Sequence, residues 1–91
     1  MNLSDKVSIP SQVMVRQVGE EVVILDLASG TYFGLDPVGA RIWALMGEGR
    51  ALAEICVTML EEYEVEREQL EADVLRLAGE LAERGLVTPA Q

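Results

Sequence analysis

The sequence contains no histidine and only one cysteine among its 91 residues. Without histidine, the chain lacks the commonest general base, the commonest zinc ligand and the histidine of a Ser-His-Asp triad. A single cysteine, Cys56, can form neither an intramolecular disulfide nor a cysteine-pair metal site. Its neighbours Ile55 and Val57 are apolar, which favours a packed thiol inside a helix over a reactive one. These absences predict a protein that is not an enzyme and holds no metal or other cofactor.

Basic residues are also scarce, since 7 Lys and Arg stand against 16 Asp and Glu, for a formal net charge of −9. DNA-binding domains usually present a basic face, so we expect no nucleic-acid partner. The same acidity argues against an anionic membrane surface, and no apolar run is long enough to span a bilayer. The first residues lack the apolar run of a signal peptide. We therefore expect a cytoplasmic protein, and its acidity is compatible with a partner that carries Lys or Arg.

The length and the apolar fraction of 49% indicate one globular domain. Residues 1–11 are expected to form a flexible N-terminal lead-in, and residues 12–88 the single domain. Residues 12–18 alternate in polarity and predict a half-buried strand. Residues 22–27 form a nearly continuous apolar run, which predicts a strand buried on both faces. Residues 31–35 predict a short third strand that completes an antiparallel meander.

The pair Asp36-Pro37 marks the change from strands to helices. Asp at a cap position accepts hydrogen bonds from free helix amides, and Pro is tolerated at the first helical position. The first helix should end at Gly47, and apolar stripes predict further helices over about residues 51–63 and 66–84. The predicted fold class is therefore α+β and winged-helix-like, with a three-stranded antiparallel sheet followed by three helices.

Several motifs in this order resemble the PqqD-like family. Its members are also called RiPP recognition elements, after ribosomally synthesised and post-translationally modified peptides. The segment from Gly30 to Leu45 carries an aromatic pair, a Leu-Asp step, a small-residue pair and Ile-Trp. The other matching segments are Glu54-Ile55, Ala72-Asp73-Val74, Leu81 and Gly85-Leu86-Val87. The resemblance covers residues 12–88, and its spacing is most similar to the stand-alone leader-binding proteins of lasso-peptide clusters.

This resemblance implies a function in peptide binding. In the family, the leader of a precursor peptide binds as an added β-strand along the third strand, in a groove beside the third helix. The lasso-peptide members work with a leader-cleaving cysteine protease and a macrolactam synthetase, the macrocyclase, so that catalysis belongs to these partner enzymes. The pyrroloquinoline-quinone pathway protein, a peptide chaperone, is a less close match that implies the same fold and binding mode.

The third strand is suited to strand addition, because its edge carries no Lys or Pro to block a partner. Tyr32 and Phe33 point to opposite faces, so we expect one in the core and the other along the groove. Gly34 would let a bulky residue of the partner approach the backbone. The predicted peptide-binding residues are Thr31, Tyr32, Phe33, Gly34, Leu35, Leu70, Asp73, Val74, Arg76, Leu77 and Glu80.

Within the third helix, the flank formed by Asp73, Arg76 and Glu80 is expected to face the third strand, because the resemblance includes Asp73. The opposite flank, formed by Leu75, Ala78 and Ala82, is the other possibility. A solvated charged face is the alternative, in which Glu80 and Arg84 form a surface pair four residues apart.

Two other functions remain as alternatives. A winged-helix DNA-binding domain fits the topology, although a recognition helix should carry several basic or amide side chains. An interaction or oligomerisation module is the second alternative, since residues 22–27 leave an apolar sheet face that a homodimer could cover.

Overall fold

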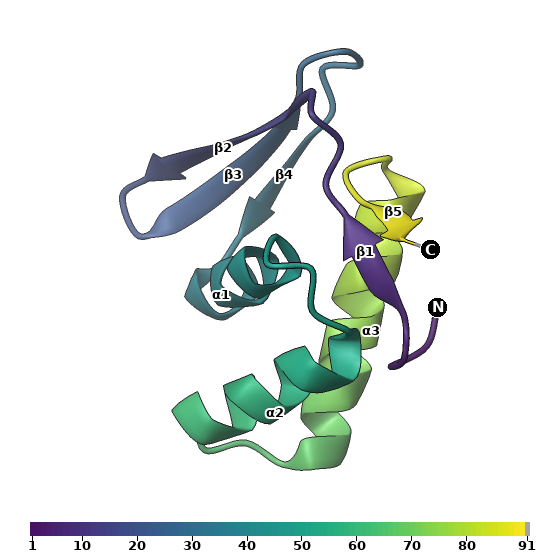
Figure 1. The fold of residues 1–91 in the computed structure, drawn as a ribbon. Helices are drawn as coiled ribbons and strands as arrows, with labels where there is room; N and C mark the ends of the chain where they lie inside the picture. Colours follow the sequence, from purple (N-terminus) through teal and green to yellow (C-terminus); the bar gives the residue numbers. More distant parts are fainter. Residues whose placement is uncertain (91) are drawn as a thin grey trace.

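In the computed structural model, which describes residues 1–90, a three-stranded sheet packs against three helices (Figure 1). This arrangement confirms the predicted fold class. The elements are, in chain order, β1 (Lys6–Ser8), β2 (Val13–Val18), β3 (Glu21–Asp26), β4 (Tyr32–Leu35), α1 (Pro37–Met46), α2 (Leu52–Glu62), α3 (Arg67–Glu83) and β5 (Thr88–Ala90).

The main sheet is an antiparallel meander in which β3 lies between β2 and β4. Its two turns contain Gly19 and Gly30, whose φ angles of 65° and 77° are ones that glycine adopts without a steric penalty. Ile24 of β3 pairs with Val15 of β2 and Phe33 of β4, and Ile24 is fully buried. These three residues therefore mark the sheet face that packs on the helices, and β2 and β4 are its two edges.

The other face of the sheet is far more exposed than the sequence predicted. On this face Leu25 pairs with Met14 and Tyr32, and Tyr32 is 70% exposed. Most of β2 is exposed rather than half-buried, and β3 is fully buried at positions of one face only. Both expectations were wrong, for different reasons. The helices cover a single face of the sheet, so β3 has one covered face rather than two. β2 is an edge strand, and Val15 is 49% exposed even on the helix-facing side.

A second, two-stranded sheet joins the two ends of the domain, with β1 antiparallel to β5 (Figure 1). Val7 of β1 is buried in the core, and the Asp5 carbonyl accepts a hydrogen bond of 2.9 Å from the Leu52 amide. The expected flexible lead-in, residues 1–11, therefore contains a short strand, and neither β1 nor β5 was predicted from the sequence. Three residues are too few to show a period, so only the pairing reveals them.

The junction between β4 and α1 has the predicted cap. Asp36 Oδ1 accepts a hydrogen bond of 2.7 Å from the Gly39 amide, and Pro37 opens the helix. A Cβ atom on Gly39 would lie 3.2 Å from that Asp36 oxygen and 3.3 Å from Leu35 Cδ2. Glycine at this position thus allows the strand and the helix to meet closely, which shapes one end of the groove described below.

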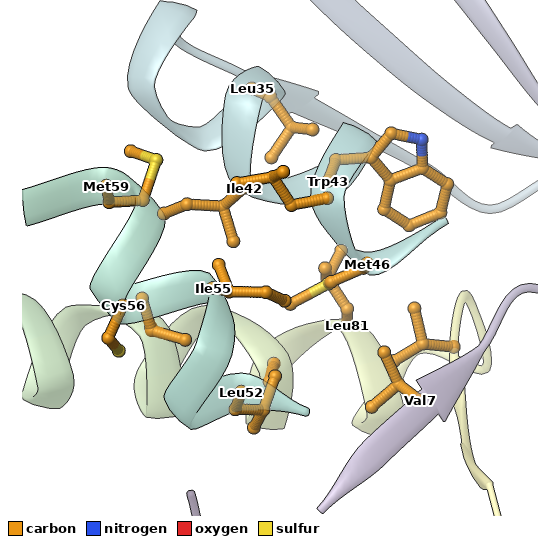
Figure 2. Close-up of a cluster of buried hydrophobic side chains, with 14 of the residues drawn as sticks. Val7, Leu35, Ile42, Trp43, Met46, Leu52, Ile55, Cys56, Met59 and Leu81 are labelled. Atoms are coloured by element: carbon orange, nitrogen blue, oxygen red, sulfur yellow. The ribbon is translucent and has the colours of Figure 1, made fainter. Parts of the chain in front are cut away.

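The core lies between the three helices and the inner face of the sheet (Figure 2). Ile55 and Met59 of α2 and Leu81 of α3 are completely buried there, and Trp43 of α1 packs at the margin, as expected for a core aromatic. Cys56 is also buried, and burial raises the pKa of its thiol. The thiol therefore stays protonated at neutral pH, which agrees with the predicted packing role.

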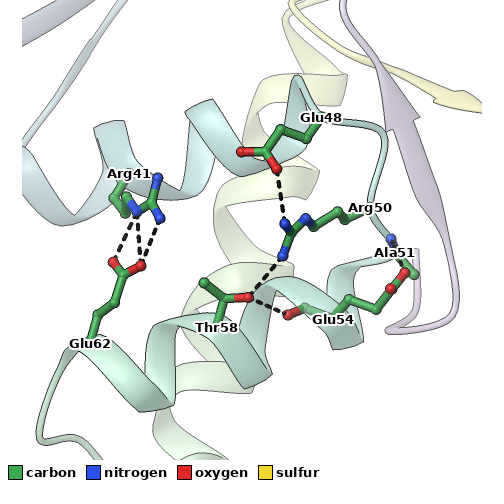
Figure 3. Close-up of polar contacts among 7 residues, drawn as sticks. All are labelled: Arg41, Glu48, Arg50, Ala51, Glu54, Thr58 and Glu62. Atoms are coloured by element: carbon green, nitrogen blue, oxygen red, sulfur yellow. Dashed lines mark hydrogen bonds and ion pairs between the residues drawn. The ribbon is translucent and has the colours of Figure 1, made fainter.

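Polar contacts brace α1 against α2 (Figure 3). Arg41 donates three hydrogen bonds to the Glu62 carboxylate, the shortest being 2.7 Å. This guanidinium holds the pKa of Glu62 below its usual value. Near the start of α2, the Glu54 side chain accepts from the Ala51 amide at 3.0 Å and closes the first turn. Within residues 1–90, no helix combines the length and the apolar character needed to cross a membrane.

Candidate functional site

An open groove of about 250 Å³ lies where β4, the start of α1 and α3 meet. Figure 1 shows the strand β4 running down to α1, with α3 to the right of both. The residues that line the groove are Phe33, Gly34, Leu35, Asp36, Val38, Gly39, Ile42, Asp73, Arg76, Leu77 and Glu80.

The backbone of β4 has a free edge beside this groove. The Asp26 amide donates a hydrogen bond of 2.8 Å to the Thr31 carbonyl, so these two residues form a hydrogen-bonded pair. Such pairs alternate along an antiparallel ladder, which directs the backbone groups of Phe33 toward β3. By the same alternation, the N–H and C=O groups of Tyr32 and Gly34 point away from β3. An added strand could bond to these four groups.

The floor of the groove is apolar. Leu35 and Ile42 are buried, whereas Leu77 and Val38 are partly exposed to the open space. Phe33 forms the wall on the β4 side, and the guanidinium carbon of Arg84 lies 4.9 Å from its ring centroid. That distance is typical of a cation–π contact, which holds the ring in place from the end of α3.

Charged side chains from α3 form the rim. Arg76 pairs with Asp73 at 3.0 Å, and Gln69 Nε2 donates to the same Asp73 oxygen at 3.0 Å. Glu80 is partly buried, and within residues 1–90 its carboxylate makes no hydrogen bond or ion pair. The alternative pairing of Glu80 with Arg84 is therefore absent, because Arg84 stacks on Phe33 instead.

The structure brings together most of the residues that the sequence suggested. From α3, the flank of Asp73, Arg76 and Glu80 faces β4, and Leu77 lies in the groove with them. Phe33, Gly34 and Leu35 contribute from β4.

Four suggested residues do not line the groove. Leu70 and Val74 are buried in the core, 5% and 0% exposed, so they support α3 rather than face the open space. Thr31 lies just before β4, where its hydroxyl hydrogen-bonds to Ser29. Tyr32 projects its ring from the opposite face of the sheet and offers only backbone groups to the edge.

The expectation that Tyr32 and Phe33 divide between core and groove was thus wrong. Phe33 does both, because it packs against the core and lines the groove, and the Tyr32 ring does neither. Sequence reasoning also missed the contribution of the cap residue Asp36, that of Val38, Gly39 and Ile42 in α1, and the stacking of Arg84. The Asp36-Pro37 cap was a usable signal, since it places the first turn of α1 directly after β4.

Comparisons with known proteins agree with this geometry. The family model of the coenzyme PQQ synthesis protein D (PqqD) matches residues 21–87. A solved structure described as TbiB1 in complex with the TbiA(beta) leader peptide is 41% identical, with a TM-score of 0.80, over 88% of this chain and 93% of that one. Another, lasso peptide synthetase B1 complexed with the leader peptide, is 31% identical, with a TM-score of 0.83, over 92% and 99%. Curated protein sequences gave no significant match. The chain belongs to the PqqD family.

Proposed function

We propose that this protein binds the leader segment of a ribosomally made precursor peptide in lasso-peptide biosynthesis. The observation that carries the proposal is the likeness to two structures that hold leader peptides, at 41% and 31% identity over nearly the whole chain. An open strand edge beside an apolar groove supports it, because this combination suits an extended peptide.

The leader is proposed to bind as a fourth strand beside β4. Its backbone would bond to the free groups of Tyr32 and Gly34, and alternate side chains would enter the groove toward Leu77. A Cβ atom on Gly34 would meet nothing within 4 Å, so the packing of this chain does not itself require glycine there. A bound segment of about 10 to 15 residues corresponds to one strand with its flanks.

The protein acts as an adaptor in this proposal, and the chemistry belongs to its partners. A leader-cleaving cysteine protease and a macrolactam synthetase would receive the bound precursor. Holding the precursor on an adaptor that also binds the enzyme raises the effective concentration of substrate at the active site. The matching family model is named for coenzyme PQQ synthesis, so a precursor of that pathway is the second candidate ligand.

A binding titration tests the proposal. A fluorescently labelled leader from a precursor gene beside the gene of this protein is titrated with the purified chain, and a scrambled leader serves as control. We expect saturable binding of the true leader, with a Kd of about 1 μM or tighter. A PQQ-type precursor in a parallel titration separates the two candidates. Absence of binding to every neighbouring precursor contradicts the function.

Delivery is tested separately, by cleavage of the full precursor with the protease encoded nearby. We expect cleavage to accelerate when the adaptor is present and to return to the basal rate when excess free leader competes for the groove. An unchanged rate in the presence of the adaptor contradicts delivery but leaves leader binding intact.

A further inference from the structure

Three carboxylates line the groove, and they differ in what they contact. The Asp36 carboxylate is occupied by the cap of α1, and the Asp73 carboxylate by Arg76 and Gln69. Glu80 alone among them has no hydrogen bond or ion pair within residues 1–90, although it is partly buried. The groove therefore contains one carboxylate with unused capacity to accept hydrogen bonds.

The two arginines closest to Glu80 along α3 are engaged elsewhere. Arg76 pairs with Asp73, and Arg84 lies over the Phe33 ring. A peptide bound in the groove would cover Glu80 and remove part of its water. A charge that is desolvated without a partner is costly, so the covering peptide must supply a donor to avoid that cost. The net charge of −9 on this chain favours a donor that is itself positively charged.

The position of Glu80 along the groove follows from the same contacts. Arg84, one helical turn beyond Glu80, reaches the Phe33 ring, which places Glu80 toward that end. Leu35 and Ile42 lie at the other end, where β4 joins α1. Side chains on one face of an added strand recur every second residue, about 7 Å apart. The residue that meets Glu80 and the residue that fills the apolar end are therefore separated by an even number of positions.

We propose that Glu80 selects leaders that carry a Lys or Arg on their groove-facing side, at an even spacing from the apolar residue held between Leu35, Ile42 and Leu77. This inference rests on the proposed leader-binding function and adds a charge requirement to it. The basic residue forms an ion pair with Glu80 only in the complex, so it contributes to discrimination between leaders as well as to affinity.

The test compares two glutamates of α3. Glu80→Gln removes the proposed contact, and Glu83→Gln makes the same change of charge one turn away at an exposed position. With the labelled leader of the neighbouring precursor, we expect E80Q to weaken binding about 3- to 10-fold, the scale of a partly exposed ion pair. E83Q should stay within about 2-fold of the unmodified protein. Circular dichroism confirms that both variants fold.

A charge exchange locates the partner residue. Each Lys or Arg of the leader is changed singly to Glu, and each peptide is titrated against the unmodified protein and Glu80→Lys. We expect one position at which the Glu peptide binds the unmodified protein poorly and E80K better than the original leader does. That position should lie at an even spacing from an apolar residue whose change to Ala also weakens binding.

Several results overturn the inference without touching leader binding itself. These are a tightly bound leader with no Lys or Arg, an equal loss of affinity in E80Q and E83Q, and a scan in which E80K rescues no position. If the unmodified protein binds no leader at all, the proposed function fails first and the selectivity fails with it.

Discussion

The sheet has two open edges, and they offer a partner the same backbone chemistry in different surroundings. At β2 the Leu27 amide donates to the Gln12 carbonyl at 3.0 Å, so alternation leaves the backbone groups of Val15 and Gln17 unpaired. Neither β2 nor β4 contains Lys or Pro, which commonly protect edges, and β2 is the longer strand. Judged by its backbone alone, β2 is the better template for an added strand.

What distinguishes the two edges is the groove. The lining includes residues of β4, α1 and α3 but none of β2. In strand addition, backbone hydrogen bonds supply affinity for any extended chain, and side-chain pockets select among sequences. An open edge therefore allows any extended peptide to add as a strand, and the adjacent groove selects among peptide sequences.

The largest effect is expected from proline at the β4 edge. The Tyr32 amide faces away from β3, so Tyr32→Pro removes a donor to the added strand without breaking the existing ladder. The ring also obstructs the approaching backbone. We expect leader affinity to fall about 100-fold, corresponding to about 3 kcal/mol for lost and obstructed hydrogen bonds. Titration of the labelled leader, followed by fluorescence anisotropy, measures this change in affinity. Phe33→Pro is unsuitable, because that amide faces β3.

Val15→Pro makes the matched change at the other edge, since the Val15 amide also points away from β3. We expect leader affinity within about 2-fold of the unmodified protein, because β2 contributes no residue to the groove. Equal losses in the two proline variants would mean that both edges bind leader, or that proline disturbs the whole sheet. Thermal unfolding of both variants separates these two explanations.

The apolar floor should have the next largest effect. Leu75 and Leu77 are both partly buried against the core from α3, but only Leu77 lines the groove. We expect Leu77→Ala to weaken leader binding about 10-fold, as contact with roughly 50 Å² of apolar surface is lost. Leu75→Ala should leave binding nearly unchanged. Both variants should lose about 1 to 2 kcal/mol of stability in urea unfolding, which would show that stability alone does not explain the difference.

A smaller effect is expected at the wall of the groove. Arg84→Ala removes the cation that stacks on Phe33, a contact worth about 0.5 to 1 kcal/mol at an exposed site. The freed ring should lower leader affinity about 2- to 3-fold. Arg16→Ala removes one positive charge from β2 and should have no such effect. If both arginine variants lose affinity equally, long-range charge rather than the ring determines the result.

The sequence was sufficient to predict elements that are marked by a pattern of neighbouring residues, such as apolar spacing or a helix cap. The Asp36-Pro37 cap, the three strands of the main sheet and the flank of α3 that faces β4 all followed from spacing or family resemblance, and the structure has each of them. The features that the sequence did not reveal depend on how the sheet and the helices pack on one another. An apolar run such as residues 22–27 does not say whether one face or two are covered, and the pairing of β1 with β5 joins segments 82 residues apart in sequence.

The groove shows the same limit at the level of side chains. Alternation along β4 correctly placed Tyr32 and Phe33 on opposite faces of the sheet. Which of the two faces borders the groove depends on the position of the helices. Among residues 1–90, Glu80 likewise has no ion-pair partner because the Arg84 side chain lies over the Phe33 ring instead of pairing with Glu80. Local spacing allows both pairings, so the choice requires the three-dimensional arrangement.

The smallest effect on binding is expected at the brace between α1 and α2, away from both edges. Arg41 lowers the pKa of Glu62, so the folded state favours the charged carboxylate. Its contribution to stability is therefore present above the ordinary pKa of Glu, near 4.5, and is lost as the pH falls through the lowered folded value. Glu62→Gln should lower the Tm at pH 7 more than Glu61→Gln, an exposed neighbour, and the difference should shrink in acid.

Leader affinity of the Glu62→Gln variant at pH 7 should equal that of the unmodified protein, because neither Arg41 nor Glu62 lines the groove. This outcome would confine selectivity to β4, α3 and the first two turns of α1. A loss of affinity comparable with that of Leu77→Ala would instead mean that the angle between α1 and α2 sets the width of the groove. The contrast between the two sheet edges would then depend on the packing of the helices as well as on the residues that line the groove.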